Sequence, residues 1–200
     1  MIKQATNSYL ITPSLINNIK YLVSLENIDY DKIISVLKRE PQETNEAMQS
    51  GIIYEEETLK GKTNASEIVC GGAYQVARSK IIEVDEINYM IYGRIDFLKA
   101  GVIYDIKRIV YQYHIQKYFG SAQTVIYLEL FPEAREMTYV VSDDLDNIHL
   151  ETYYRDQIES VNTLIREFIT LLKILKLDNL YYENWRCKWI CLIKQKKQLV

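Results

Sequence analysis

Four short runs rich in isoleucine, valine and tyrosine follow one another between residues 68 and 110. They read IVCGGAYQVA, KIIEV, INYMIYGRIDFL and VIYDIKRIV, and their length and β-branched content are typical of strands. Gly71, Gly72 and Gly101 interrupt the pattern and indicate turns. The middle of the chain is therefore predicted to form a meander of three or four strands.

Segments with the apolar spacing of helices lie on both sides of this meander. Thr12 and Pro13 are typical of an N-cap and a first helical position, and weaker helical patterns follow over about 29–38 and 44–59. After the meander, the spacing predicts a helix over about 118–131, a short strand MTYVVS and a long amphipathic helix over about 150–177. This order is typical of α/β or α+β folds, and we expect a central mixed β-sheet of four to five strands flanked by helices.

The length and charge of the chain limit its organisation. A chain of 200 residues with 48% hydrophobic residues can bury one substantial core, so a single domain over 1–200 is expected. It would comprise a helical N-terminal part over about 10–60, a central core over about 65–142 and a C-terminal helical part over about 150–200. The formal net charge of -3 excludes a general basic coat, so any polyanion must bind locally.

The cysteines and the first residues of the chain predict a location. Cys70, Cys187 and Cys191 are an odd number without a pairing framework, and MIKQATNSYL lacks the pattern of a signal peptide. The longest apolar stretches fall short of the about 20 residues that span a bilayer. We expect a protein of the reducing cytoplasm that does not associate with membranes.

The segment GRIDFLKAGVIYDIK holds two acids and a lysine inside strand-like runs. Asp105 and Lys107 are two residues apart on the predicted strand, so their side chains leave the same face. If Ala100 and Gly101 form a two-residue turn, Asp96 lies opposite Asp105, whereas a three-residue turn would shift this pairing by one. Facing carboxylates are destabilising unless a cation lies between them, and Mg²⁺ suits carboxylate oxygens. The alternative is ordinary cross-strand ion pairing of Asp96 and Lys107 at a sheet edge.

Five segments in order resemble the PD-(D/E)XK nucleases, and more narrowly their RecB-like branch and its phage relatives. The segments are ITPSLINNIKYL, AMQSGIIYEEE, GRIDFL, YDIK and SAQTVIY, and together they span about 10–142. The resemblance implies a restriction-endonuclease-like core that hydrolyses DNA phosphodiester bonds with Mg²⁺ or Mn²⁺. It further implies an exonuclease of phage or mobile-element type, located in the host cytoplasm if phage-encoded.

The same resemblance assigns roles to individual residues. Glu55, Asp96 and Asp105 correspond to the metal ligands, and Lys107 corresponds to the catalytic lysine. A helix pair that flanks the active site in the RecB-like branch corresponds to Gln123 and Tyr127.

The chain also departs from the family pattern. Ile95 stands where the family name has a proline, and Tyr54 stands where the RecB-like branch has a histidine. Glu56 and Glu57 follow Glu55, so which of the three faces the metal stays open. Some RecB-like enzymes hold an iron–sulfur cluster on four cysteines, but this chain has three, so neither a cluster nor zinc is expected.

The expected partners of a DNA nuclease are its DNA substrate and either a second copy of the chain or a recombination protein. Two other functions remain open as alternatives. One is a catalytically inactive module of the same fold that binds nucleic acid or protein, which the net negative charge favours. Another is an interaction protein that uses an exposed apolar stripe on the 150–177 helix. We assign Tyr111, Tyr113 and Tyr118 to core packing, with stacking on unpaired bases as the alternative.

Overall fold

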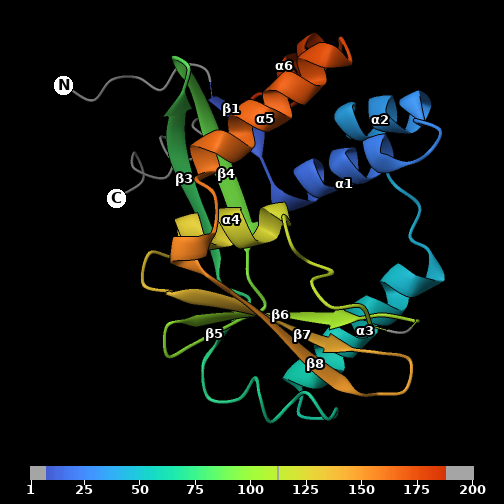
Figure 1. Ribbon diagram of the computed structural model, residues 1–200, viewed down its shortest axis with the longest axis vertical. Helices are drawn as coiled ribbons and strands as arrows, with labels where there is room; N and C mark the ends of the chain where they lie inside the picture. The colour runs from blue at the N-terminus through green and yellow to red at the C-terminus, as the bar shows by residue number, and fades with distance from the viewer. Residues whose placement is uncertain (1–7, 112, 188–200) are drawn as a thin grey trace, which may run out of the picture. The chain divides into compact units, whose positions relative to one another are not determined.

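The computed structural model describes residues 8–111 and 113–187, so Cys191 lies outside the described residues. Within this part, α-helices combine with two β-sheets, one of three strands and one of five (Figure 1). The predicted α+β class with a mixed, helix-flanked sheet is confirmed. No helix among the described residues is long and apolar enough to cross a bilayer. The chain divides into two compact units, one of residues 8–41, 79–92 and 161–187 and one of residues 42–78 and 93–160.

The first unit contains most of the three-stranded sheet and four helices. The sheet order is β1-β4-β3, from β1 (Ser8–Ile11), β3 (Ala77–Val84) and β4 (Ile87–Arg94). The helices are α1 (Pro13–Ser24), α2 (Tyr30–Leu37), α5 (Val161–Ile174) and α6 (Asp178–Asn184). The predicted start of the first helix is confirmed, because Thr12 Oγ1 accepts a hydrogen bond from the Leu15 amide at 3.2 Å.

The second unit contains the five-stranded sheet, in the order β2-β5-β6-β7-β8. Its strands are β2 (Ala73–Tyr74), β5 (Phe97–Lys99), β6 (Val102–Arg108), β7 (Glu136–Ser142) and β8 (Ile148–Tyr154). The pair β6 and β7 is parallel and the other pairs are antiparallel, which makes the sheet mixed. The unit also holds α3 (Glu46–Leu59), α4 (Ala122–Leu130) and the 3₁₀ turn η1 (Arg155–Gln157).

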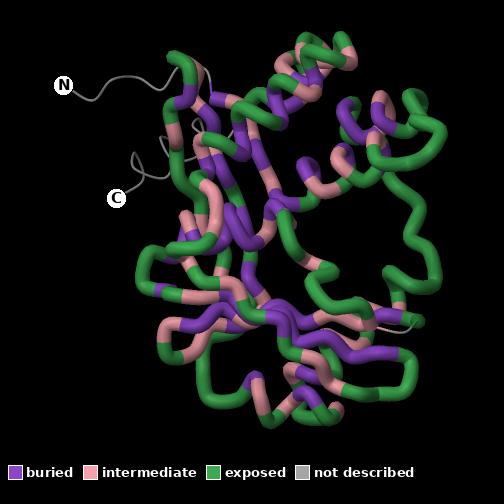
Figure 2. The backbone as a smooth tube through the Cα atoms, in the orientation of Figure 1, coloured by how far each residue is buried: buried purple, intermediate pink, exposed green. Residues whose placement is uncertain are grey.

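The two helices of the second unit cover opposite faces of its sheet (Figure 1). On one face, Phe97, Ile106 and Val140 form a buried cluster against which Tyr54 and Leu59 of α3 pack. On the other face, side chains of α4 contact residues of β6 and β7. The strand β7, which lies between β6 and β8, is therefore buried along most of its length (Figure 2).

The hairpin between β5 and β6 has the predicted two-residue turn. Ala100 and Gly101 have φ values of 50° and 77°, as the two central residues of a type I′ turn require. The strand pairs run from Lys99 with Val102 to Phe97 with Tyr104. Continued by one residue, this register brings Asp96 opposite Asp105, as predicted.

The predicted helix over 150–177 is wrong in its first part. Residues Ile148–Tyr154 form β8, antiparallel to β7, and α5 begins only at Val161. In β8, Glu151 is buried while Leu150 and Thr152 are exposed, which is the alternation of a strand with one covered face. Pairing satisfies the backbone groups along this side of β7, and this tertiary requirement overrides the helical spacing. The apolar side of α5 is buried, so it presents no exposed stripe for a partner.

Two other elements are shorter than their sequence patterns. Of the predicted strand over 68–77, Ala73 and Tyr74 form β2 and Ala77 begins β3, while residues 68–72 lie outside strands. The predicted helix over 118–131 begins at Ala122 because Ser121 caps it, accepting a hydrogen bond from the Gln123 amide at 3.3 Å.

Candidate active site

Asp105 and Lys107 lie on the same face of β6, as their spacing predicts. The side chain of Asp105 is 1% exposed and that of Lys107 is 28% exposed, and Asp105 Oδ2 forms an ion pair with Lys107 Nζ. The intervening Ile106 points to the other face, into the cluster below α3. The alternation of β6 therefore separates a charged face from an apolar one.

Asp96 lies directly before β5, where the hairpin register brings it to β6. Its Oδ2 accepts a hydrogen bond from the Ile106 amide at 2.8 Å, and its backbone oxygen accepts one from the Gln75 amide at 2.8 Å. Both bonds hold the carboxylate beside Asp105. The alternative prediction was an ordinary ion pair between Asp96 and Lys107 across the two strands. Lys107 instead forms its ion pair with Asp105.

The charges at this site act strongly on each other. Burial raises the pKa of Asp96 well above its usual range, and the nearby carboxylate of Asp105 raises it further, against the opposing charge of Lys107. The pKa of Lys107 is also raised, because attraction by Asp105 and Asp96 outweighs the effect of burial. Lys107 is therefore a permanent cation between two acids that repel each other.

Glu55 is the one of the three consecutive glutamates of α3 that faces this site. It is half-buried, its Oε1 lies 3.5 Å from Gln75 Nε2, and its charge contributes to the raised pKa of Asp96. Glu56 instead pairs with Lys60 on the exposed side of the helix, with 3.3 Å between charged atoms. Glu57 is exposed. The helix geometry thus separates three residues that the sequence left equivalent.

The predicted pair on α4 contacts β6 and the last residue of β4. Gln123 Nε2 donates a hydrogen bond to Asp105 Oδ1 at 3.1 Å and lies 3.5 Å from Tyr127 Oη. Tyr127 Oη in turn donates to the backbone oxygen of Arg94 at 2.9 Å. One turn of helix therefore connects β6 to the end of β4, and the structure brings together all six predicted site residues in one unit.

Gly93 is a site residue that the sequence reasoning missed. A Cβ atom at this position would lie 2.6 Å from Cε1 of Tyr127 and 3.1 Å from Cδ1 of Leu130. Only a residue without a side chain allows α4 to approach this closely. The glycine directly before the first acidic segment was a visible signal, but its meaning depends on a helix about 30 residues further along the chain.

Tyr139 was also missed as a neighbour of the site, and Tyr118, which the sequence analysis assigned to core packing, lies against it. Tyr139 pairs with Asp105 across β6 and β7 and points to the same face, where its Oη lies 2.9 Å from Thr124 Oγ1 of α4. The ring of Tyr118 stacks on Tyr139, with 4.3 Å between centroids and an interplanar angle of 11°. Two parallel tyrosine rings therefore line the side of the site next to Lys107.

The acidic groups fit a hard divalent cation in a particular way. Among residues 8–111 and 113–187, no three His, Cys, Asp or Glu side chains are placed to share one metal ion. Asp96 and Asp105 nevertheless offer two adjacent carboxylates, and Oδ2 of Asp105 is buried without a hydrogen bond of regular geometry. Mg²⁺ commonly uses one or two carboxylates and completes its shell with water and substrate phosphate.

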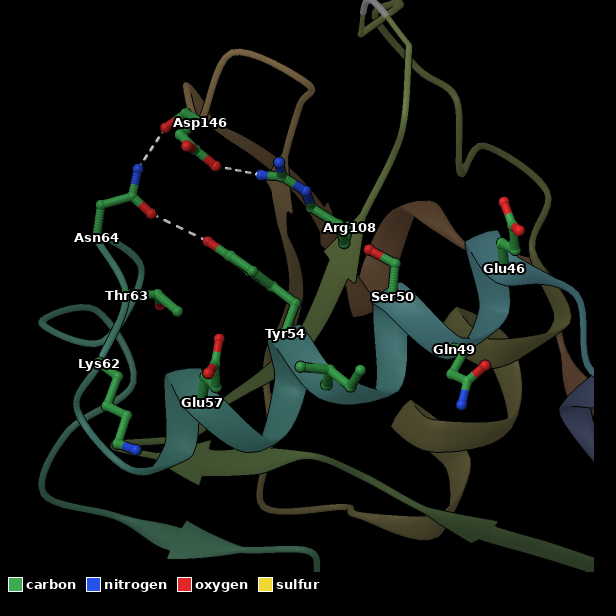
Figure 3. A pocket seen from close by; sticks show the side chains of 11 residues that line it. Glu46, Gln49, Ser50, Tyr54, Glu57, Lys62, Thr63, Asn64, Arg108 and Asp146 are labelled. Atoms are coloured by element: carbon green, nitrogen blue, oxygen red, sulfur yellow. Dashed lines mark hydrogen bonds and ion pairs between the residues drawn. The ribbon is translucent and has the colours of Figure 1, made fainter.

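A separate pocket of about 780 Å³ lies along α3 and is lined by other residues, among them Tyr54 and Arg108 (Figure 3). Arg108 lines it from the end of β6, with its guanidinium 2.6 Å from Ser142 Oγ and paired with Asp146. Tyr54 donates to Asn64 Oδ1 at 3.0 Å on its other side. Because Arg108 points to the face opposite Lys107, this pocket does not contain the acidic cluster.

Several solved structures share the fold of this chain. A crystal structure of a protein named SSO0001 matches with a TM-score of 0.52 and 18% sequence identity, over 85% of this chain and 80% of that one. A protein from Eubacterium rectale, named "Putative exonuclease", matches with a TM-score of 0.57 and 14% identity, over 90% of this chain and 85% of that one. No family model and no curated protein matches the chain. At these identities the likeness concerns the fold alone.

Proposed function

We propose that the protein is a metal-dependent nuclease that hydrolyses phosphodiester bonds of DNA. The observation that carries this proposal is the convergence of Asp96, Asp105 and Lys107 on one face of a β-hairpin. Two carboxylates and a permanent cation suit the binding of a divalent metal together with a phosphate. The fold likeness to a protein named as an exonuclease supports the same reaction class and the exonuclease form of it.

The donor set supports Mg²⁺ or Mn²⁺ as the cofactor. Asp96 and Asp105 would hold the ion, and Glu55 would add negative charge from α3. The mutual repulsion of the two acids, only partly offset by Lys107, is a cost that a divalent cation would remove. When bound, such an ion lowers the pKa of a coordinated water and polarises a phosphoryl oxygen.

The residues of the chain would divide the remaining work. Lys107 places a fixed positive charge where negative charge accumulates on the phosphate. Gln123 holds Asp105 in one orientation through its hydrogen bond to Oδ1. Tyr127 anchors α4 to the Arg94 backbone and so sets the position of Gln123.

A cleavage assay tests the proposal. Labelled single-stranded and double-stranded DNA, linear and circular, would be incubated with Mg²⁺, with Mn²⁺ and with EDTA. We expect cutting only with metal, loss of cutting in Asp105→Asn and Lys107→Ala, and normal cutting in Asp144→Asn, an exposed acid outside the site. Intact circles beside digested linear DNA would support an exonuclease. A well-folded wild type that cuts no substrate would instead favour the inactive binding module.

A further inference from the structure

The segment of residues 109–120 connects the strand that carries Lys107 to the helix that carries Gln123. Three of its large apolar side chains lie on the surface: Tyr111 is 49% exposed, Ile115 is 85% exposed and Phe119 is 75% exposed. Side chains of this size usually contribute to the core or to an interface. The assignment of Tyr111 to core packing is therefore wrong. Because these three side chains do not stabilise the core, we look for a ligand that they could bind.

A buried carboxylate fixes this segment on the sheet. Glu151 of β8 is 8% exposed, and its Oε1 accepts a hydrogen bond from the Tyr118 amide at 2.9 Å. Its Oε2 accepts one from Tyr113 Oη at 2.7 Å, and Tyr153 donates a further hydrogen bond to Oε1. The Tyr113 ring also stacks on His149, with 4.3 Å between centroids. The exposed side chains are thus carried on a backbone that is anchored from inside.

Aromatic rings continue from the catalytic face to this surface. Tyr118 stacks on Tyr139, and the charges of Lys107 and Asp105 both act on its phenol. Lys117 Nζ lies 5.6 Å from the centroid of the Tyr118 ring and 4.2 Å from that of the Tyr111 ring. A ligand chain held at Lys107 would therefore meet aromatic faces and a second lysine as it leaves the site.

The charge of this part of the chain is suited to a polyanion. No Asp or Glu occurs in the sequence between Asp105 and Glu129, although the chain has 27 acidic residues in all. Lys107 and Lys117 fall inside this acid-free stretch, as does Arg108, which points to the opposite face and pairs with Asp146. In a protein with a formal net charge of -3, this stretch has no acid along the chain, and the Glu151 carboxylate beneath it is 8% exposed and bound to Tyr113 and Tyr118.

We propose that the 109–120 segment binds single-stranded DNA, with Tyr111 and Phe119 stacking on bases and Lys117 contacting the phosphate backbone. This inference rests on the proposed nuclease function, since it assigns the strand state of the substrate. Exposed aromatic rings can stack on the bases of a single strand, whose faces are accessible. The bases of a duplex are already stacked on each other and offer no free face. Stacking also supplies affinity that does not depend on an excess of basic residues, and this protein has a formal net charge of -3.

The test is DNA binding in EDTA, where no cleavage is expected. Fluorescence anisotropy would compare a labelled single strand with a hairpin duplex of the same composition. We expect the single strand to bind more tightly, and we expect Tyr111→Ala and Phe119→Ala each to weaken its binding about tenfold, a typical effect of removing one stacking ring. Phe119→Tyr should retain binding. Tyr21→Ala and Ile174→Ala replace side chains that are 64% and 73% exposed outside this segment, and they should leave binding unchanged.

Glu151→Gln tests how the segment is held. An amide in place of the carboxylate would direct an N–H group at donors that need an acceptor, so the surface should move while Asp105 and Lys107 keep their places. We expect KM for single-stranded DNA to rise more than kcat falls.

The outcomes separate the two proposals. Cleavage by the wild type together with unchanged binding in Tyr111→Ala and Phe119→Ala would overturn the stacking surface and leave the nuclease standing. Binding that is lost in these variants, without any cleavage by the wild type, would support the surface and remove the nuclease. Equal or tighter binding of the duplex would also overturn the inference.

Discussion

Gln123 Nε2 donates a hydrogen bond to Asp105 Oδ1 across 3.1 Å, from a helix to a strand that lie 18 positions apart in sequence. The bond leaves Oδ2 of the same carboxylate directed to Lys107. One oxygen of Asp105 is therefore held by the helix, and the other faces the charged lysine.

Replacing Gln123 should weaken the site without unfolding the protein. In Gln123→Ala, Asp105 loses its orienting donor, so we expect cleavage to slow about 10- to 100-fold and the Mg²⁺ concentration for half-maximal rate to rise. Rates measured across a Mg²⁺ titration check this. Gln49→Ala removes an exposed glutamine from α3 and serves as the control. An unchanged Mg²⁺ dependence in Gln123→Ala would exclude the orienting role.

Two glycines of the second unit should respond in opposite ways to alanine. Gly93→Ala places a Cβ atom 2.6 Å from the Tyr127 ring, and we expect the free energy of unfolding to fall by about 1–3 kcal/mol. Gly51 lies inside α3 with no atom within 4 Å of the added Cβ, so Gly51→Ala should raise it by about 0.5–1 kcal/mol. Urea unfolding measures both. Equal effects would contradict the close approach of α4.

Asp96→Asn should stabilise the metal-free protein at neutral pH while abolishing cleavage. Because folding raises the pKa of Asp96, the folded state binds its proton more tightly, and the free energy of unfolding falls as pH rises above about 4. The amide removes this penalty and can still accept the hydrogen bond from the Ile106 amide. We expect a gain of about 1 kcal/mol or more, or about 2–4 °C in Tm.

Thermal unfolding in EDTA between pH 5 and pH 8 measures this gain, with Asp144→Asn as an exposed control. The difference between wild type and Asp96→Asn should widen as pH rises. Mg²⁺ should raise the Tm of the wild type and have little effect on the variant. A variant that is less stable than the wild type at pH 8 in EDTA would show that the buried charge of Asp96 does not destabilise the folded protein.

The three glutamates of α3 should differ in their importance. Glu55→Gln removes the charge that faces Asp96, and we expect cleavage to fall about 10- to 100-fold. Glu56→Gln and Glu57→Gln change exposed side chains and should leave the rate within about twofold. Single-turnover cleavage at saturating Mg²⁺ distinguishes them. A larger loss in Glu57→Gln than in Glu55→Gln would indicate that the helix is rotated from its described position.

The sequence predicted the parts of the fold that depend on local geometry. The turn at Ala100 and Gly101 determines the register of its hairpin, and with it the meeting of Asp96 and Asp105. Two-residue alternation likewise placed Asp105 and Lys107 on one face. The helix start at Pro13 followed from its cap. Each of these relations spans ten residues or fewer, so steric preferences of the chain settle them.

The wrong predictions concern residues whose structure depends on contacts with segments far away in the sequence. Residues 150–154 have apolar side chains that fit a helix, but the backbone of β7 offers a row of hydrogen-bonding groups, and pairing with it made them β8. Tyr111 has a large aromatic side chain of the kind that often packs in a core. It lies on the surface instead, in a segment that Glu151 holds through Tyr113 and Tyr118.

The sequence by itself predicted the acidic hairpin and the lysine beside it, and the family resemblance added the helix pair of Gln123 and Tyr127. Only the tertiary structure decided that Glu55 and not its neighbours faces Asp96, and that Gly93 is needed under Tyr127. The physical reason is that spacing along a strand or helix fixes which side chains share a face. Which face meets which partner depends on burial and hydrogen bonding summed over the whole unit.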